Sequence, residues 1–350
     1  MNEAGYTGIP SDDVTRLLDT TLPAIAADIE QLKIPGIAAV VLGGGYGRGE
    51  GGVLHTPEGD RPYNDLDFFV FSRNAGRRDT ARIAAALRPV SEKWEKKLQV
   101  AIDFGPVKNL DALAAVADTL MFQELLRGWR PVWGQPELAR YLPAREPAQL
   151  PFTEAARLLL NRGMGLLFAG NELKRPEPDP GFVCRNLNKA YLGAGDAMLI
   201  AAGAYHWRGA ERVTAFRQMA ETTGLGAAAA DRYERAWRWK LEPVPRLPEP
   251  PEEAWRACRT IYLSAFCRIS GNEPGAAPDA VVRGLRTRAR SACSFRHFLR
   301  WLIRARGIRP TALFDDPVVS LAARLYQLLT TAETCPPCPE SLLRLWRYFN

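Results

Sequence analysis

The chain has 350 residues, of which 47% are hydrophobic and 24% charged, and its formal net charge is +7. This composition is typical of a globular protein and excludes a disordered or fibrous one, while the length predicts about two domains. No apolar run is long enough to cross a membrane, the first residues lack a signal-peptide pattern and six cysteines are too few for a disulfide scaffold, so we expect a cytoplasmic protein.

The first 150 residues combine helical and strand patterns. Ser11, followed by two aspartates, is a typical start of a helix, because acidic residues in the first turn suit the helix dipole. Short apolar runs predict buried strands at 37–42, 66–71 and 98–104, and the segment 77–97 between the last two predicts a helix.

Beyond residue 150 the chain is rich in alanine, leucine and arginine and contains no convincing strand. The predicted helical segments are 153–170, 186–208, 211–240, 252–270, 281–306 and 317–330, with proline-rich breaks between several of them. We therefore predict an α+β protein in two domains. Residues 1–150 should form a short mixed sheet flanked by helices, and residues 151–350 a bundle of helices.

One segment of the second half concentrates positive charge. Between Val281 and Pro310 there is no acidic residue but nine arginines: Arg283, Arg286, Arg288, Arg290, Arg296, Arg300, Arg304, Arg306 and Arg309. Without these nine, the 46 basic residues of the chain would not outnumber its 39 acidic ones. Such a block fits RNA or another phosphate-rich partner. A solvated helix face is the simpler alternative, because arginine favours helices.

A glycine-rich loop follows the first predicted strand. The segment Gly43-Gly-Gly-Tyr-Gly-Arg-Gly49 contains five glycines, so its backbone N–H groups can approach a phosphate closely. It lacks the Gly-Lys-Ser/Thr ending of a Walker loop. It also lacks the following parallel strand that a dinucleotide fingerprint requires. By itself, this loop does not define an activity.

Three aspartates make the pattern more specific. Asp65 and Asp67 are two residues apart at the start of a predicted strand, so both carboxylates should lie on one face. Such a close pair repels unless a cation lies between the two, and oxygen ligands suit magnesium. Asp103 lies inside the apolar run 98–104, where an unpaired charge is costly. If the two strands are neighbours, the three carboxylates can converge beside the glycine loop. The structural alternative is that they cap a turn and form a salt bridge.

These residues together resemble the DNA polymerase β-type nucleotidyltransferase superfamily, which has a Gly-Gly/Ser loop, an Asp-x-Asp/Glu pair and a distal third carboxylate. The resemblance covers residues 37–105, and the segment 126–134 is similar to one that often follows in small members of the superfamily. One departure is the distance from Gly45 to Asp65, 20 residues, which is longer than usual.

The resemblance implies transfer of a nucleoside monophosphate from an NTP to an acceptor hydroxyl, with release of pyrophosphate. ATP is the favoured donor. Two Mg²⁺ ions, or Mn²⁺ in their place, would be required. The residues implied in nucleotide binding are Gly44, Gly45 and Arg48, and those implied in metal binding and catalysis are Asp65, Asp67 and Asp103. Asp103 would also help to deprotonate the acceptor.

Two further features lie in the second half. Members of the superfamily often close the cleft with a helical domain that carries a phosphate-binding lysine, which makes Lys189 a nucleotide-binding candidate. Asp196 lies two turns later on the same helix face, so a structural ion pair is an equal alternative.

Cys335 and Cys338 have C-x-x-C spacing, but two more zinc ligands are lacking nearby. We expect two free thiols near a surface turn.

The acceptor is left open by the sequence. A small molecule is the first interpretation, because no RNA-binding module is recognisable. An RNA end that contacts the arginines between Arg283 and Arg309 is the second, and a protein side chain the third. The alternative from another class is a non-catalytic member of the same superfamily, which binds a nucleotide or a partner protein without turnover.

Overall fold

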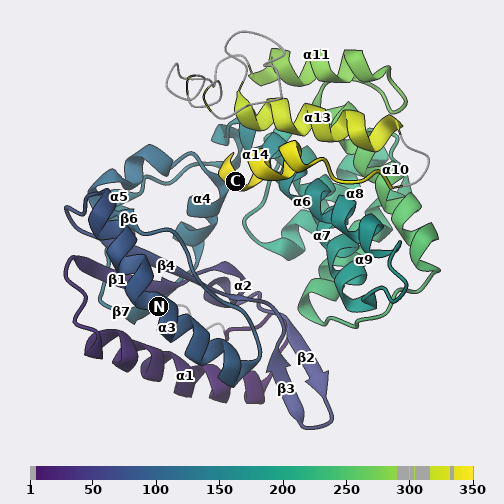
Figure 1. Cartoon of the computed structure of the whole chain (residues 1–350). Coiled ribbons are helices and arrows are strands. Elements are labelled where there is room, and N and C mark those ends of the chain that lie inside the picture. Colours follow the sequence, from purple (N-terminus) through teal and green to yellow (C-terminus); the bar gives the residue numbers. More distant parts are fainter. Residues whose placement is uncertain (1–4, 290–298, 300–302, 304–315, 332–334, 350) are drawn as a thin grey trace. The chain divides into compact units, whose positions relative to one another are not determined.

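The chain is an α+β protein with a small mixed sheet and many helices (Figure 1), which confirms the predicted class. The computed structural model describes residues 5–289, 299, 303, 316–331 and 335–349. Two compact units can be distinguished: Met1–Glu146 with Arg238–Val244, and Pro147–Trp237 with Pro245–Asn350. A short segment from the second half of the sequence therefore belongs to the first unit.

The first unit contains all the strands that the structure describes. Its elements are α1 (Asp12–Gln31), β1 (Ile37–Leu42), α2 (Gly44–Arg48), β2 (Val53–Thr56), β3 (Gly59–Pro62), β4 (Leu66–Ser72), α3 (Arg77–Leu98), β5 (Ile102–Phe104), β6 (Lys108–Asn109), η1 (Leu110–Val116), α4 (Leu120–Arg127), β7 (Arg130–Trp133) and α5 (Leu138–Tyr141). The main sheet has the order β5-β4-β1-β7, and β6 also pairs with β4. Strand β1 is antiparallel to β4 and β7, whereas β4 and β5 are parallel.

Both faces of this sheet are covered, because side chains of β1 alternate between them. Val40 and Leu42 pack with the apolar sides of α1 and α3, which lie on one side of the sheet in Figure 1. Ala39 and Val41 pack with η1, α4 and α5 on the opposite side. The glycine loop leaves the sheet at the end of β1, between these two layers.

Helix α1 begins as predicted. Ser11 is its N-cap, and the Oγ of Ser11 accepts a hydrogen bond from the backbone N–H of Val14 (3.3 Å). The predicted strands 37–42 and 66–71 are present as β1 and β4.

The third predicted strand, 98–104, is shorter than expected. Helix α3 continues through Leu98, and β5 contains Ile102–Phe104 alone. Leu98 falls four residues after Trp94 and completes the buried side of α3, so burial on the helix outweighs the apolar run. Gln99 then ends the helix with a positive φ of 55°.

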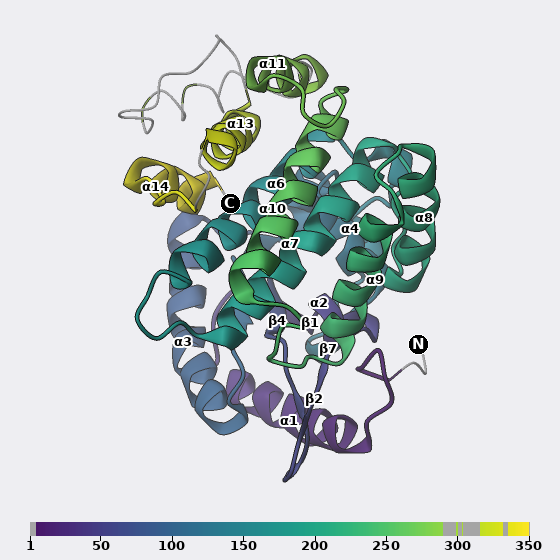
Figure 2. The ribbon, with the colours of Figure 1, turned by 90° about the vertical axis from the view of Figure 1, so that its right-hand side faces the viewer.

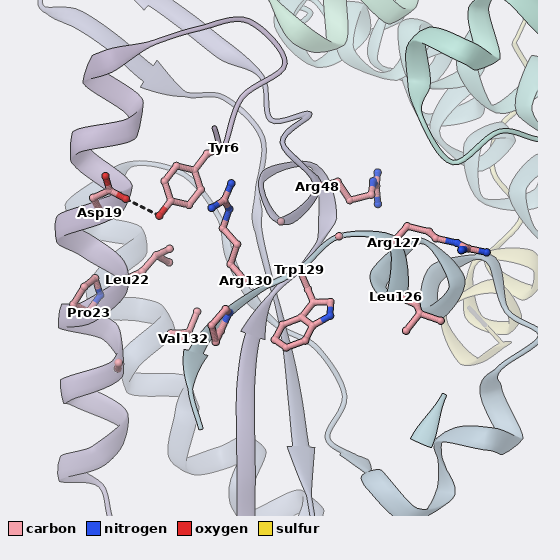
Figure 3. A pocket seen from close by; sticks show the side chains of 14 residues that line it. Tyr6, Asp19, Leu22, Pro23, Arg48, Leu126, Arg127, Trp129, Arg130 and Val132 are labelled. Carbon is pink, nitrogen blue, oxygen red and sulfur yellow. Dashed lines mark hydrogen bonds between the residues drawn. The ribbon is translucent and has the colours of Figure 1, made fainter. Parts of the chain in front are cut away.

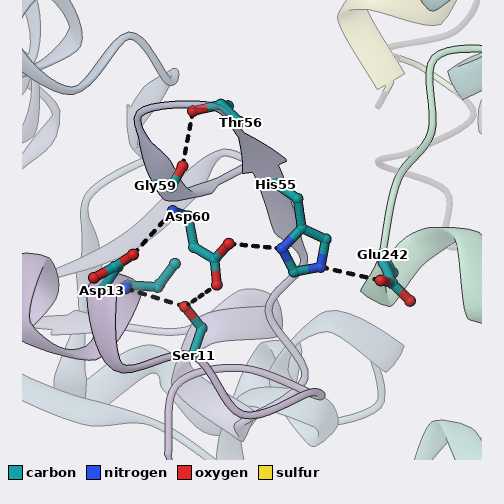
Figure 4. Close-up of polar contacts among 8 residues, drawn as sticks. Ser11, Asp13, His55, Thr56, Gly59, Asp60 and Glu242 are labelled. Carbon is teal, nitrogen blue, oxygen red and sulfur yellow. Dashed lines mark hydrogen bonds and ion pairs between the residues drawn. The ribbon is translucent and has the colours of Figure 1, made fainter.

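The insert between the glycine loop and the aspartates forms the hairpin β2–β3, which the sequence did not predict. His55 on this hairpin binds two carboxylates (Figure 4): its Nδ1 is 2.6 Å from Asp60 and its Nε2 is 3.0 Å from Glu242. The hydroxyl of Ser11 also donates to Asp60 (2.9 Å). These contacts attach the hairpin to the start of α1 and to the segment 238–244 of the same unit.

The second unit consists of helices throughout its described part: η2 (Pro147–Gln149), α6 (Phe152–Glu172), α7 (Pro180–Ala201), α8 (Gly209–Thr222), α9 (Ala227–Leu241, whose last residues belong to the first unit), α10 (Pro251–Ile269), α11 (Pro278–Ala289), α13 (Pro317–Thr331) and α14 (Glu340–Phe349). Figure 2 shows α6, α7 and α10 side by side, and α7 contacts both of the others. None of the helices in the described ranges is long and apolar enough to span a membrane.

The predicted helix 211–240 is wrong as a single element, because α8 ends at Thr222 and α9 begins at Ala227. Gly224 and Gly226 adopt φ values of 70° and 80°, which are incompatible with a continuous right-handed helix. The predicted helix 186–208 begins earlier, at Pro180, and ends at Ala201. Of the predicted helix 281–306, the described part ends at Ala289.

Candidate functional site

Two of the predicted carboxylates lie next to each other on neighbouring strands. Asp67 of β4 and Asp103 of β5 are register partners in a parallel pair, so their side chains lie on the same face of the sheet. Both line a small pocket of about 100 Å³, together with Phe69 of β4 and Phe122 of α4. The two strands are therefore neighbours, which is the condition for the carboxylates to converge.

Asp65 adds negative charge beside this pair. It precedes β4 and is exposed. Partial burial raises the pKa of Asp103, and the negative charges of Asp65 and Glu95 raise it further. Among the described residues, the carboxylates of Asp65 and Asp103 have no hydrogen-bond or ion-pair partner, so the salt bridge that was the alternative for Asp103 is not formed within this part of the chain. The site therefore concentrates negative charge in a way that a bound cation would relieve.

The glycine loop lies directly against Asp67. The backbone N–H of Gly43 donates to the backbone carbonyl of Asp67 (2.8 Å). Gly44 has a φ of 58°, and a Cβ atom on it would lie 2.1 Å from Oδ2 and 3.1 Å from Cβ of Asp67. Any larger residue at position 44 would thus adopt a strained φ and would have to move the carboxylate of Asp67. Gly45 is also tight, since a Cβ there would lie 3.2 Å from the backbone oxygen of Glu50.

Tyr46 connects the loop to the segment that precedes the aspartates, and sequence reasoning missed this role. The side chain is buried, and its hydroxyl donates to the carbonyl of Gly52 (2.6 Å). The same hydroxyl oxygen accepts from the backbone N–H groups of Tyr63 (2.9 Å) and Asn64 (3.3 Å). Burial raises the pKa of Tyr46, so the hydroxyl stays protonated and can make all three bonds. A large aromatic residue within a glycine-rich loop was the available signal.

Arg48 belongs to a charged network inside the first unit. It donates to Glu124 (3.1 Å) and lies 3.7 Å from Glu50, which is also 3.5 Å from the Nζ of Lys240. The Arg48 side chain is 11% exposed, so these carboxylates fix its position. Its role in nucleotide binding stays a prediction.

Lys189 lies half-buried on α7 in the second unit. Asp196, the suggested ion-pair partner on the same helix, binds Arg212 (3.1 Å) and accepts a hydrogen bond from the hydroxyl of Tyr233 (2.5 Å). Asp196 is therefore part of the packing between α7, α8 and α9. The role of Lys189 in nucleotide binding stays a prediction.

The chemistry of the donors fits magnesium better than their arrangement does. Asp65, Asp67 and Asp103 offer the carboxylate oxygens that Mg²⁺ prefers, and the pKa of Asp103 is raised by its partial burial and by the negative charges of Asp65 and Glu95. Across residues 5–289 and the later described segments, however, no group of three histidine, cysteine, aspartate or glutamate side chains is gathered as a metal ion would require. The predicted Mg²⁺ ions stay a prediction.

The arginine block is partly structural. Arg288 donates to the carbonyls of Ile269 (3.0 Å) and Ala201 (3.3 Å), at the ends of α10 and α7, and lies over the ring of Phe152. Such contacts satisfy helix-terminal carbonyls rather than present a charge to RNA. Arg290, Arg296, Arg300, Arg304, Arg306 and Arg309 lie outside the described residues.

Cys335 and Cys338 are free thiols, as expected. The expected surface position is wrong for Cys335, which is buried, and burial raises its pKa to about 11. Its Sγ donates to the carbonyl of Leu167 (3.4 Å). Because the thiolate is the reactive form, a raised pKa argues against a redox role.

No family model, curated protein or solved structure matches the chain. The resemblance to the nucleotidyltransferases therefore depends on residues 37–105 and on the geometry described above.

Proposed function

We propose that the first unit is a magnesium-dependent nucleotidyltransferase domain that transfers a nucleoside monophosphate from an NTP, ATP in the first instance, to an acceptor hydroxyl. The observation that carries the proposal is the position of Asp67. It is the register partner of Asp103 on one side and is in contact range of the Gly44 backbone on the other. Carboxylates for metal ions thus lie beside a loop whose backbone a phosphate can approach closely.

The order of the elements supports the same proposal. A strand leads into the glycine loop, and the next strand of the main sheet follows Asp65 and carries Asp67 at its start. A helix then leads to the strand that carries Asp103. This is the order in which the superfamily places its loop, its carboxylate pair and its third carboxylate. The hairpin β2–β3 accounts for the long spacing between the loop and the pair.

In the proposed reaction the acceptor oxygen forms a bond to the α-phosphorus of the NTP. The bond from that phosphorus to the bridging oxygen breaks, and pyrophosphate leaves. Asp103 takes the proton of the acceptor hydroxyl as a general base. Asp65, Asp67 and Asp103 would hold Mg²⁺, which when bound neutralises charge on the triphosphate and the leaving group.

The test uses the full chain with each of the four NTPs, with and without Mg²⁺. A ligand that binds the folded state alone stabilises it by about 2.7 kcal/mol at one hundred times its Kd, so a magnesium-dependent rise in melting temperature should identify the donor. The Asp65→Asn/Asp67→Asn double variant should lose this rise and all pyrophosphate release. Asp111→Asn is the matched control, because Asp111 is exposed on η1 and does not line the pocket of Asp67 and Asp103. Near-normal turnover in the double variant would refute the proposal.

A second candidate function is nucleotide binding without turnover. The absence of a ready metal-binding triad among the described residues favours it. It predicts a rise in melting temperature with an NTP but no pyrophosphate release with any acceptor. Small hydroxyl compounds are the first acceptors to screen, and short RNAs the second. Salt dependence of the rate would mark an RNA acceptor, since phosphate contacts weaken as salt rises.

A further inference from the structure

The small pocket that Asp67 and Asp103 line also has an apolar wall. Phe69 of β4 and Phe122 of α4 line it, and their rings meet edge to face with 5.8 Å between the centroids. Met121 of α4 lines it as well and is 50% exposed, so this wall reaches the protein surface. An aromatic or apolar group can therefore pack against this wall while a polar group of the same ligand lies beside a carboxylate.

A positive charge lies toward the other end of this pocket. Asp103 of β5 is the register partner of Asp67. Lys108 of β6, which also lines the pocket, is the register partner of Phe71, four residues further along β4. Partners in a sheet share a face and each residue advances a strand by about 3.3 Å, so the backbones of Asp103 and Lys108 lie about 13 Å apart on one face. A single ligand can thus contact the acid at one end and the amine at the other.

The side chain of Lys108 is available to such a ligand. Within the described residues, its ammonium group has no hydrogen-bond or ion-pair partner. It is half-buried beside the apolar wall. A lysine in this position favours a ligand with one negative charge, because a carboxylate would supply the hydrogen bonds and the countercharge that the ammonium group lacks.

The volume of the pocket, about 100 Å³, limits the size of the ligand. A cavity of about 150 Å³ can hold one benzene ring. This pocket, which is open at Met121, thus has room for one ring or a short chain but not for a nucleobase with its sugar. It suits an acceptor better than it suits the nucleotide.

We propose that this pocket binds the acceptor and that the acceptor is a small hydroxy acid built on one aromatic ring. Its hydroxyl would lie beside Asp103, its ring against Phe69 and Phe122, and its carboxylate would bind Lys108. The assignment as acceptor rests on the proposed function. The preference of the pocket for such a ligand requires no turnover and can be measured by itself.

The first test is isothermal titration of the full chain with 4-hydroxyphenylacetate and with tyramine, which has the same hydroxyl and ring but an amine in place of the carboxylate. The acid should bind at millimolar concentration and tyramine more weakly. Lys108→Gln should weaken binding of the acid by about ten-fold, the usual cost of losing a hydrogen bond to a charged group. Lys96→Gln is the matched control, because Lys96 is exposed on α3 and does not line the pocket.

A larger pocket of the first unit, about 720 Å³ between α1 and the segment 126–132 (Figure 3), is the competing place for the probe. No residue lines both pockets. Gly105→Val and Ala26→Leu each add the volume of an isopropyl group, Gly105→Val to the small pocket and Ala26→Leu to the large one. Valine should be tolerated at position 105, because the one described atom within 4 Å of a Cβ atom placed there is the backbone oxygen of Phe68, at 3.5 Å. Gly105→Val should abolish binding of 4-hydroxyphenylacetate, and Ala26→Leu should leave it unchanged.

Pyrophosphate release tests the assignment as acceptor. With the donor NTP and Mg²⁺, 4-hydroxyphenylacetate should raise release by about ten-fold or more, whereas phenylacetate, which lacks the hydroxyl, should not. Binding of the NTP and of 4-hydroxyphenylacetate without release would overturn this assignment.

The ligand class has its own refutation. It is overturned if 4-hydroxyphenylacetate does not bind, if tyramine binds more tightly, or if binding survives Gly105→Val. Failure of the proposed function is distinguishable from these results. In that case no NTP raises the melting temperature with Mg²⁺, while the pocket still prefers the acid and loses it in Lys108→Gln and Gly105→Val.

Discussion

Replacing Gly44 by alanine tests the contact between the glycine loop and Asp67. The new Cβ would lie 2.1 Å from Oδ2 and 3.1 Å from Cβ of Asp67, and the residue would keep a φ of 58°. The positive φ alone costs an L-residue about 1–2 kcal/mol. The contact adds a second effect, because the Asp67 side chain must rotate away from its position beside Asp103.

Gly36→Ala is a matched control for the cost of the positive φ. Gly36 has a φ of 82°, and nothing lies within 4 Å of a Cβ atom placed there. Both variants should lose about 1–2 kcal/mol of folding free energy, which corresponds to roughly 2–8 °C in melting temperature for a unit of this size. The difference between them isolates the displacement of Asp67.

Magnesium and nucleotide binding should separate the two variants. Gly36→Ala should keep the magnesium-dependent rise in melting temperature with the NTP donor, whereas Gly44→Ala should lose most of it. The assay is a thermal-shift titration of both variants and the wild type with NTP and Mg²⁺. If Gly44→Ala binds the nucleotide as tightly as Gly36→Ala, the loop does not position Asp67 for the ligand and the reasoning fails.

Four other substitutions give further predictions. Tyr46→Phe should cost about 1–3 kcal/mol, because it leaves buried backbone groups without a partner, whereas Tyr141→Phe, on α5, should cost little in the same urea titration. The pKa of His55 is raised chiefly by its hydrogen bond to a carboxylate, so its contribution to stability is complete below the unfolded-state pKa of 6.5 and is lost as the pH rises through the folded-state pKa. The gap in melting temperature between wild type and His55→Gln should therefore close in alkaline buffer, and a constant gap would contradict this. Because the pKa of Asp103 is raised, Asp103→Asn should stabilise the metal-free protein at pH 7 and lose that gain as the pH falls through the folded-state pKa. Equal melting temperatures of wild type and Asp103→Asn at pH 7 would count against this prediction. Arg288→Gln should lower stability without changing the salt dependence of any RNA binding, and a smaller salt slope would instead place this arginine on RNA.

Local patterns made much of the first unit predictable. The N-cap Ser11, the strand 37–42 and the helix from Arg77 are visible in the sequence, because caps and hydrophobic periodicity depend on neighbours a few residues away. The same holds for Asp67 at the start of β4, whereas Asp65 lies one residue before the strand. Prediction was weakest where two local patterns overlapped, as at Leu98, which the helix α3 buries.

Contacts between distant parts of the chain could not be predicted in this way. The register that pairs Asp67 with Asp103 joins residues 36 apart, and the hydroxyl of Tyr46 binds backbone groups on both sides of a hairpin that carries no strong sequence signal. Arg288 appeared in the sequence as free charge, but it binds the ends of two helices that are folded beside it. The sequence by itself determined which residue types and local elements are present, because periodicity and capping act over short distances. The fold alone determined which of these residues meet, because register and packing depend on burial summed over the whole unit.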